Sequence, residues 1–381
     1  MAPVTVLMTL MGLEIGGAET HAVVLARDLK EMGYNVLMAS RGGIYEETVG
    51  RYGIKHFKVP LDNTKVSSIL RSYKAIKNII VSENVSLIHA HARIPAFVSS
   101  LARRPAGTHF ITTAHAMFST AFRFRYFSRW GEKTIAVSSD IREHLIAHFG
   151  VPEENIILIP NGIDTEAFNP SIAVENVQRE LGLDPRDQKI VYVSRLDYAL
   201  APVAMELIRA FERLHAEFPY LKLIIVGGGE QIGDIAAEAG KVNVRAGKEI
   251  IALLGARTDV NRIMVAGDLV VGASRVALEA MACARNVVLA GGEGFGGLID
   301  EGSLDLLEND NFTGRLFRKK ATAQKLEESI REFLVAPPGQ KEQAGLRLRK
   351  YIVDKHSSKT VARETAGVYE SVLAEKEKFT T

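Results

Sequence analysis

The chain of 381 residues contains a single cysteine, Cys283. One cysteine excludes an intramolecular disulfide framework and any metal site built from several cysteines. No apolar run reaches the roughly 18 residues needed to span a bilayer. The N-terminus lacks the basic region, apolar stretch and cleavage site of a signal peptide. We therefore expect a cytoplasmic protein and leave open a peripheral association with the inner face of the membrane.

Net charge is also small, because 47 Lys and Arg residues are balanced by 45 Asp and Glu residues. A net charge of +2 gives no support to nucleic-acid binding. Apolar residues make up 47% and charged residues 24% of the chain, which is typical of a globular protein. At this length two domains are expected.

Short apolar runs alternate with amphipathic segments along the whole chain. Most of the runs are apolar at consecutive positions, as in parallel strands that helices cover on both faces. Strands are predicted at 4–8, 35–39, 86–90, 110–113, 134–137 and 156–159, and in a second series at 190–193, 223–226, 251–254, 269–271 and 287–289. The repeated strand–loop–helix order predicts an α/β protein with two doubly wound, Rossmann-like sheets.

The polar, irregular stretch from 165 to 189, with Pro170 and Pro185, is expected to connect the two domains. The predicted domains are 1–170 and 171–359, and a helical segment within 360–381 is expected to return to the first domain. Ligands bind outside the carboxyl ends of parallel strands, where helix N-termini suit phosphate.

Eight short segments occur in an order that is similar to one known family. They are Gly16–Thr20, Ile88–His91, Thr113–His115, Val137–Ser139, Ile159–Asp164, Ser194–Leu196, Val226–Gly229 and Leu278–Cys283. Together they resemble glycosyltransferase family 4, the retaining GT-B enzymes, over nearly the whole chain. The resemblance implies two Rossmann-like domains that face a central cleft. It also implies transfer of a sugar from a nucleotide-sugar to a hydroxyl acceptor without a metal or other cofactor. The expected donor is UDP-linked, because UDP is the commonest carrier in the family. Cell-envelope or other glycan synthesis is the expected setting.

The resemblance assigns roles to several residues. Arg195 matches an arginine that binds the diphosphate, and a guanidinium can donate hydrogen bonds to two phosphate oxygens at once. His115 matches a histidine that touches the donor sugar, so these two residues are the catalytic candidates. Gly16, Gly17 and Gly228 lie in loops where a missing side chain lets backbone approach the donor closely.

Further donor contacts are expected where a predicted strand turns into the next helix. The amides near Ser274, Arg275 and Val276 would face phosphate oxygens. Glu279 matches a carboxylate that accepts hydrogen bonds from the donor ribose. Arg257 lies in the segment 255–259, where the family holds the base mainly through backbone groups.

Two positions depart from the family pattern. Leu200 stands where the family has a lysine, and Val271 stands where it has the first of two glutamates. Loss of one charged transition-state contact costs about two to three orders of magnitude in rate. Either Arg275 supplies the second cation of a working enzyme, or the chain is a degenerate member that binds without turnover. A nucleotide-sugar 2-epimerase is a third interpretation, although no acid–base set beyond His115 is evident.

The segment 122–130 alternates aromatic and basic residues. It could contact anionic lipid head groups, or an acceptor that carries phosphate and is lipid-linked. The alternative is an amphipathic helix whose aromatic residues pack and whose Arg123, Arg125 and Arg129 are solvated. His89 and His91 alternate at a strand end and are expected to be structural.

Overall fold

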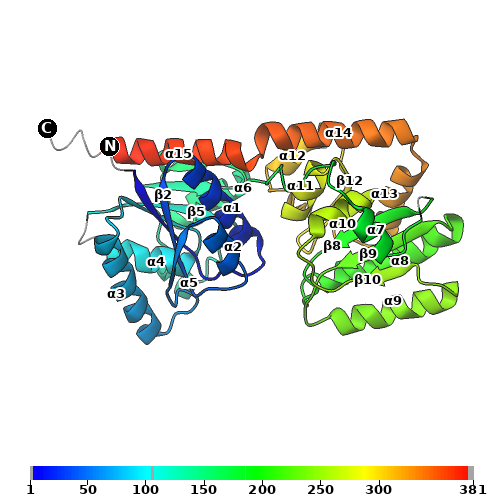
Figure 1. Ribbon diagram of the computed structural model, residues 1–381, viewed down its shortest axis with the longest axis horizontal. Coiled ribbons are helices and arrows are strands. Elements are labelled where there is room, and N and C mark those ends of the chain that lie inside the picture. Colours follow the sequence, from blue (N-terminus) through cyan, green and yellow to red (C-terminus); the bar gives the residue numbers. More distant parts are fainter. Residues whose placement is uncertain (1–2, 104–106, 185, 376–381) are drawn as a thin grey trace. The chain divides into compact units, whose positions relative to one another are not determined.

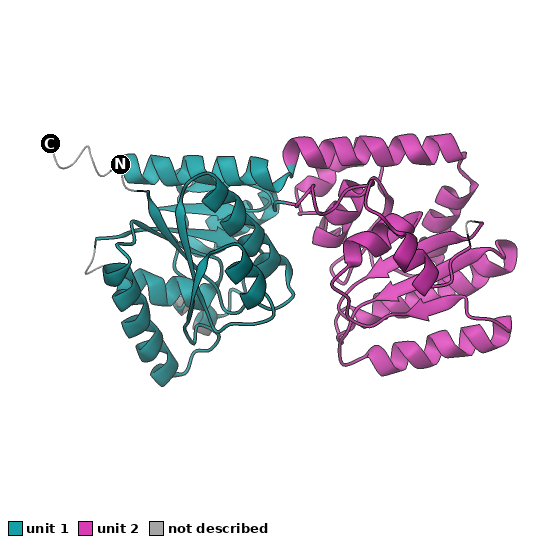
Figure 2. Cartoon of the chain, viewed as in Figure 1, with its two compact units in different colours: residues 1–162, 356–381 teal, residues 163–355 magenta. Residues whose placement is uncertain are grey.

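The computed structural model describes residues 3–103, 107–184 and 186–375, and its contacts separate two units (Figures 1 and 2). Unit 1 comprises residues 1–162 and 356–381, and unit 2 comprises residues 163–355. Arg104, Pro185 and residues 376–381 lie outside the described residues, as do the side chains of Arg123, Tyr126 and Glu375.

Unit 1 contains a seven-stranded parallel sheet in the order β3-β2-β1-β4-β5-β6-β7. Its strands are β1 (Thr5–Thr9), β2 (Asn35–Ser40), β3 (Lys55–Lys58), β4 (Leu87–Ala90), β5 (His109–Ala114), β6 (Lys133–Ala136) and β7 (Ile156–Leu158). The chain first adds strands on one side of β1 and then returns to add β4 on the other side. The carboxyl ends of β1 and β4 therefore form a topological switch point.

Helices cover both faces of this sheet. They are α1 (Gly17–Glu31), α2 (Glu46–Arg51), α3 (Val66–Ser82), α4 (Arg93–Ala102), α5 (Phe122–Tyr126), α6 (Ser139–Phe149) and α15 (Ser358–Glu375). One core cluster joins α1 and α15 to the sheet, and a second joins α3 and α4 to it. The last helix thus packs beside α1, although 300 residues and more separate them in sequence. 

Unit 2 contains a six-stranded sheet in the order β10-β9-β8-β11-β12-β13. Its strands are β8 (Gln188–Val193), β9 (Leu221–Val226), β10 (Ile251–Leu253), β11 (Leu269–Gly272), β12 (Asn286–Ala290) and β13 (Phe295–Leu298). All neighbours are parallel except β12 and β13. Because β9 and β10 lie on one side of β8 and β11 lies on the other, the switch point of this unit is between β8 and β11.

Helices again cover both faces. They are α7 (Glu175–Glu180), α8 (Ala201–Glu217), α9 (Ile232–Ala246), α10 (Val260–Ala266), α11 (Arg275–Ala282), α12 (Leu304–Glu308), α13 (Ala323–Val335) and α14 (Pro338–Lys355). One core cluster contains residues of α8 and α13, and the other contains residues of α10, α11 and α14. Both sheets are therefore doubly wound, as the alternating apolar runs predicted.

The contacts divide the chain after Gly162 and after Lys355, whereas divisions after 170 and 359 were expected. Ile163 is fully buried in a core cluster of unit 2. Phe168 and Val177 pack in the same cluster, so the segment 165–189 contributes to unit 2 rather than only connecting the units. Among the described residues, no helix is both long and apolar enough to cross a membrane.

Candidate functional site

Three loops of unit 2 meet at one edge of its sheet. Parallel neighbours end at the same edge, so the loops that follow β9, β8 and β11 lie side by side there. These loops carry Gly228, Arg195 and Ser274, respectively. The structure therefore brings residues predicted for donor binding to the switch point of the sheet, where α/β proteins bind their ligands.

The glycine loop after β9 packs tightly against the loop after β8. A Cβ atom on Gly227, whose φ is +151°, would lie 1.8 Å from the Ser194 carbonyl oxygen. A Cβ on Gly229, at φ +155°, would lie 2.4 Å from the Leu196 carbonyl carbon. A Cβ on Gly228 would lie 3.5 Å from that of Ala256, an ordinary contact. Packing thus explains Gly227 and Gly229 but does not require Gly228 to be glycine.

Arg195 is the most accessible cation among the predicted site residues. Its side chain is 72% exposed, and the Asp197 carboxylate lies 3.7 Å from its guanidinium. An exposed ion pair at this distance contributes little to stability. The Arg195 guanidinium is therefore free to exchange this partner for a phosphate.

The turn from β11 into α11 has a strained backbone. Ser274 adopts φ +52° and ψ −126°, a region that residues other than glycine rarely enter. Its amide donates to the Phe312 carbonyl oxygen at 2.5 Å, and the Val276 amide donates to the Ala273 carbonyl oxygen at 3.2 Å. Both amides, which were expected to face phosphate, are engaged within the protein, so a ligand here would have to displace these bonds or use other groups.

Arg275 and Glu279 form a buried ion pair along one face of α11. Arg275 Nε donates to Glu279 Oε1 at 2.7 Å, and the two side chains are 12% and 11% exposed. Burial raises the pKa of Glu279, and the positive charge of Arg275 opposes this rise. The residue proposed as a second phosphate cation is therefore paired with the residue proposed to hold the ribose.

Arg257 is also committed to carboxylates. Its guanidinium donates to Asp259 Oδ1 at 2.8 Å and to Glu180 Oε1 at 2.6 Å, and these two contacts raise its pKa. The side chain links α7 to the start of α10. Recognition of a base near Arg257 would thus depend on the backbone of 255–259.

The two departures from the family pattern are apolar contacts in this structure. Leu200 precedes α8, and its Cδ2 lies 2.8 Å from where a Cβ on Gly292 would be. Val271 is fully buried in β11, within a core cluster. A carboxylate at position 271 would enter this apolar cluster, where the burial of a charge is costly, whereas valine fits it.

In unit 1, the predicted glycine pair lies at the switch point, and His115 lies one strand further along the sheet. Gly16 precedes α1 in an extended conformation, and a Cβ on Gly17 would meet nothing within 4 Å. His115 follows β5. The packing of the protein therefore does not require a glycine at position 17.

A chain of buried polar side chains surrounds His115. His115 Nδ1 lies 3.4 Å from the Asn161 side-chain oxygen, and its Nε2 lies 3.1 Å from His91 Nδ1. Because an amide oxygen only accepts, Nδ1 of a neutral His115 carries the proton and His91 Nδ1 donates to Nε2. The His91 Nε2 atom is then an acceptor, and it is buried with no partner among the described residues.

Two further residues complete this histidine cluster (His21, His89, His91 and His115). The Gly162 amide donates to His21 Nδ1 at 3.2 Å, and the His21 and His115 ring centres are 5.1 Å apart. His89 lies between Tyr369 and Thr113, at 2.8 Å and 2.6 Å. Burial lowers the pKa of His89 to about 3 and that of His91 well below its usual value, so both are neutral near pH 7.

Sequence reasoning identified His115 but gave no role to His21 or Asn161. Asn161 lies in one of the family-like segments, and His21 lies one helical turn after the glycine pair, so both were visible as polar residues beside motifs. Their contact with His115 requires the fold. Within the part of the chain that is described, no group of three His, Cys, Asp or Glu side chains could hold a metal ion.

Comparison with family models identifies both units. The model for Glycosyltransferase Family 4 matches residues 15–167, and the model for Glycosyl transferases group 1 matches residues 187–335. A Rickettsia africae glycosyltransferase structure aligns with a TM-score of 0.80 at 19% identity, over 98% of this chain and 99% of that one. Anabaena HepE in complex with UDP and glucose aligns with a TM-score of 0.74 at 19% identity, over 96% and 99%.

These neighbours and the two sheets define a protein of the GT-B fold. The chain belongs to the glycosyltransferases that join a family 4 domain to a group 1 domain. A Listeria monocytogenes structure assigned as a UDP-N-acetylglucosamine 2-epimerase shares the fold, with a TM-score of 0.69 at 13% identity, over 98% of each chain. The fold by itself therefore does not separate transfer from epimerisation.

Relatives in sequence are distant. The GPI3 subunit of the yeast phosphatidylinositol N-acetylglucosaminyltransferase is 24% identical over 201 residues, which are 47% of this chain and only 42% of that protein. The α-maltose-1-phosphate synthase of Mycolicibacterium smegmatis is 23% identical over 396 aligned positions, covering 94% of this chain and 96% of that protein.

Proposed function

We propose that this protein transfers a sugar from a UDP-sugar to a hydroxyl acceptor, with retention of the anomeric configuration and without a metal ion. The observation that supports this most strongly is the meeting of the Arg195, Gly228 and Ser274 loops at the switch point of unit 2. The setting is cell-envelope or other glycoconjugate synthesis, which fits relatives named for transfer to phosphatidylinositol.

In the proposed reaction, unit 2 holds the nucleotide and unit 1 supplies His115. The bond between the anomeric carbon and the phosphate oxygen breaks, the acceptor oxygen bonds to that carbon, and the proton of the acceptor hydroxyl passes to the departing diphosphate. Negative charge gathers on the departing diphosphate, and Arg195 stabilises it. His115 is held in one orientation by Asn161 and His91, and because both of its ring nitrogens are engaged there, it would exchange one of these partners to hydrogen-bond the donor sugar.

A panel of UDP-, GDP- and ADP-sugars, with release of the nucleotide as the readout, tests this proposal. Proton NMR of the sugar product reports the anomeric configuration, and a parallel series with EDTA reports the metal requirement. We expect release from a UDP-sugar that EDTA does not abolish. Arg195→Gln should slow it by about two to three orders of magnitude, whereas Arg209→Gln, on the surface of α8, should not.

A non-catalytic binding protein is the second candidate, because Leu200 and Val271 replace two charged family residues. That candidate predicts UDP binding with no release from any donor. A 2-epimerase would give a changed sugar in place of a glycosylated acceptor, and the NMR readout would detect it.

A further inference from the structure

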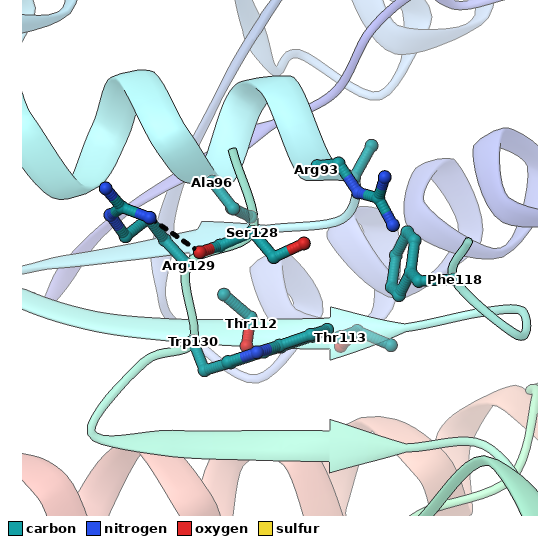
Figure 3. A pocket seen from close by; sticks show the side chains of 10 residues that line it. Arg93, Ala96, Thr112, Thr113, Phe118, Ser128, Arg129 and Trp130 are labelled. Carbon is teal, nitrogen blue, oxygen red and sulfur yellow. Dashed lines mark hydrogen bonds between the residues drawn. The ribbon is translucent and has the colours of Figure 1, made fainter. Parts of the chain in front are cut away.

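A small recess lies on unit 1, at the carboxyl ends of β4 and β5 and beside the start of α4 (Figure 3). The segment between β5 and β6 forms its other wall. Arg93, Arg129, Ser128, Phe118 and Trp130 line it, and Figure 3 shows Ser128 between the two arginines. We call it the arginine recess.

The surrounding sequence carries only positive charge. Between Glu83 and Glu132 there is no Asp or Glu, and six arginines occur. One of them, Arg103, pairs with Glu132. The recess is therefore built from a part of the chain that supplies no carboxylate of its own.

Arg93 is a cation that is held in place with no counter-ion among the described residues. Its guanidinium carbon lies 5.0 Å from the Phe118 ring centre and 5.3 Å from that of Phe124. It donates to the Ser119 carbonyl oxygen at 3.0 Å, and it makes no ion pair with a carboxylate in the described parts of the chain. Burial lowers its pKa. A guanidinium fixed between rings, with most of its five donors unused, is suited to an oxyanion.

Arg129 places a second cation at the recess. Its guanidinium lies 5.1 Å from the Phe97 ring centre, and it donates to the Ser128 carbonyl oxygen at 2.8 Å. The hydroxyls of Ser128 and Thr113 are already engaged, by the Phe124 carbonyl oxygen and by His89. Recognition by the recess therefore depends on charge rather than on neutral donors.

We propose that the arginine recess binds a phosphate or phosphodiester group of the acceptor. Its role as an acceptor subsite rests on the proposed transferase function, whereas its affinity for phosphate does not. Phe122 lies in α5, the helix that also carries Phe124, and its side chain is 88% exposed. That apolar side chain would add a contact for a phosphate borne by a lipid but not for a soluble one.

Trp130 allows a direct measurement, since it lines the recess and the chain has one tryptophan. Its fluorescence would be followed during titration with inorganic phosphate, glycerol phosphate, phosphatidylcholine vesicles, and the same vesicles with added phosphatidylglycerol. The variants are Arg93→Gln, Arg129→Gln and, as a matched control, Arg71→Gln on the exposed surface of α3. A UDP titration by calorimetry on every variant separates the recess from the donor site.

We expect a saturable change with the phosphate probes. Its midpoint should rise at least about tenfold in Arg93→Gln and stay unchanged in Arg71→Gln, with UDP affinity equal in all variants. If Arg93→Gln fails to fold, Arg129→Gln is interpreted in the same way. A stronger response to phosphatidylglycerol vesicles than to glycerol phosphate would assign the phosphate to a lipid, and equal responses would assign it to a soluble acceptor.

Two results would overturn the proposal. One is a midpoint that is the same in wild type and in both recess variants. The other is an equal response to vesicles with and without phosphatidylglycerol, together with no response to soluble phosphate. Failure of wild type to bind UDP would contradict the proposed function and leave the phosphate result intact.

Discussion

At the residue scale, the ion pair of Arg275 and Glu279 is the most constrained pair of charges among the candidate residues at the carboxyl edge of the unit 2 sheet. A buried charge that loses its partner is costly, whereas the intact pair is close to neutral in stability. Arg275 therefore acts first as the counter-ion of Glu279. Of the predicted phosphate cations, Arg195 is the one that is exposed.

Glu279→Gln should destabilise unit 2, because the buried ion pair of Arg275 and Glu279 would lose one of its two charges. The expected loss is about 3–5 kcal/mol in the free energy of unfolding, measured by urea denaturation with circular dichroism. Glu238→Gln is the matched control, since it breaks a surface pair with Lys241 on α9 and should leave stability unchanged. Equal effects of the two substitutions would mean that the buried pair has no special role.

Leu200→Lys tests whether the missing family lysine limits the binding of diphosphate. A cation restored beside the Arg195 loop should tighten UDP binding by about tenfold, as measured by calorimetry. Tyr198→Lys adds the same charge to an exposed position of the same loop and should have little effect. If both variants bind UDP equally tightly, general attraction rather than position 200 is responsible.

Acid should destabilise unit 1 through its buried histidines. His89 titrates near its usual value of 6.5 when unfolded but only at a pKa of about 3 when folded. Between these values the unfolded state binds more protons, so the free energy of unfolding falls as pH falls, by up to about 1.4 kcal/mol per pH unit for this residue. Urea denaturation followed by Trp130, which lies in unit 1, measures it. His89→Gln should flatten this dependence, whereas His148→Gln, on the exposed end of α6, should not.

At the scale of elements, the loop after β9 packs against the loop after β8 at Gly227 and Gly229, whereas this packing does not require a glycine at Gly228. Gly227→Ala should disrupt the fold, because the added methyl would overlap the Ser194 carbonyl. Gly228→Ala should fold normally, and it should weaken UDP binding if the loop backbone contacts the nucleotide. Melting temperature and calorimetry distinguish these outcomes. If Gly228→Ala binds UDP with wild-type affinity, the backbone of this loop does not contact the nucleotide.

The sequence predicted eleven of the strands, because their consecutive apolar residues are buried on both faces. It missed β3, whose residues Lys55–Lys58 are mostly polar at the sheet edge, and β13, whose Gly296 and Gly297 have no apolar side chain. It also missed α7, a short helix in a segment that was expected to be irregular. Edge elements carry little apolar patterning, so periodicity cannot reveal them.

On the scale of the whole molecule, each family model falls almost entirely on one unit, and each unit has its candidate residues at the carboxyl edge of its own sheet. The positions of Arg195, Gly228 and Ser274 were predictable, since each directly follows a strand. The partners of His115 were not, because Asn161 and His21 come from segments 46 and 94 residues away in sequence. The engagement of Arg257 and Arg275 by carboxylates was not predictable either, since side-chain pairing depends on packing.

Hydrogen–deuterium exchange with and without UDP tests most directly whether the carboxyl edge of unit 2 holds the nucleotide. The account predicts slower exchange in the segments 194–197, 227–230 and 272–279, with α3 of unit 1 unchanged. Exchange that UDP, GDP and ADP all leave unaltered in these three segments, or protection confined to unit 1, would contradict it.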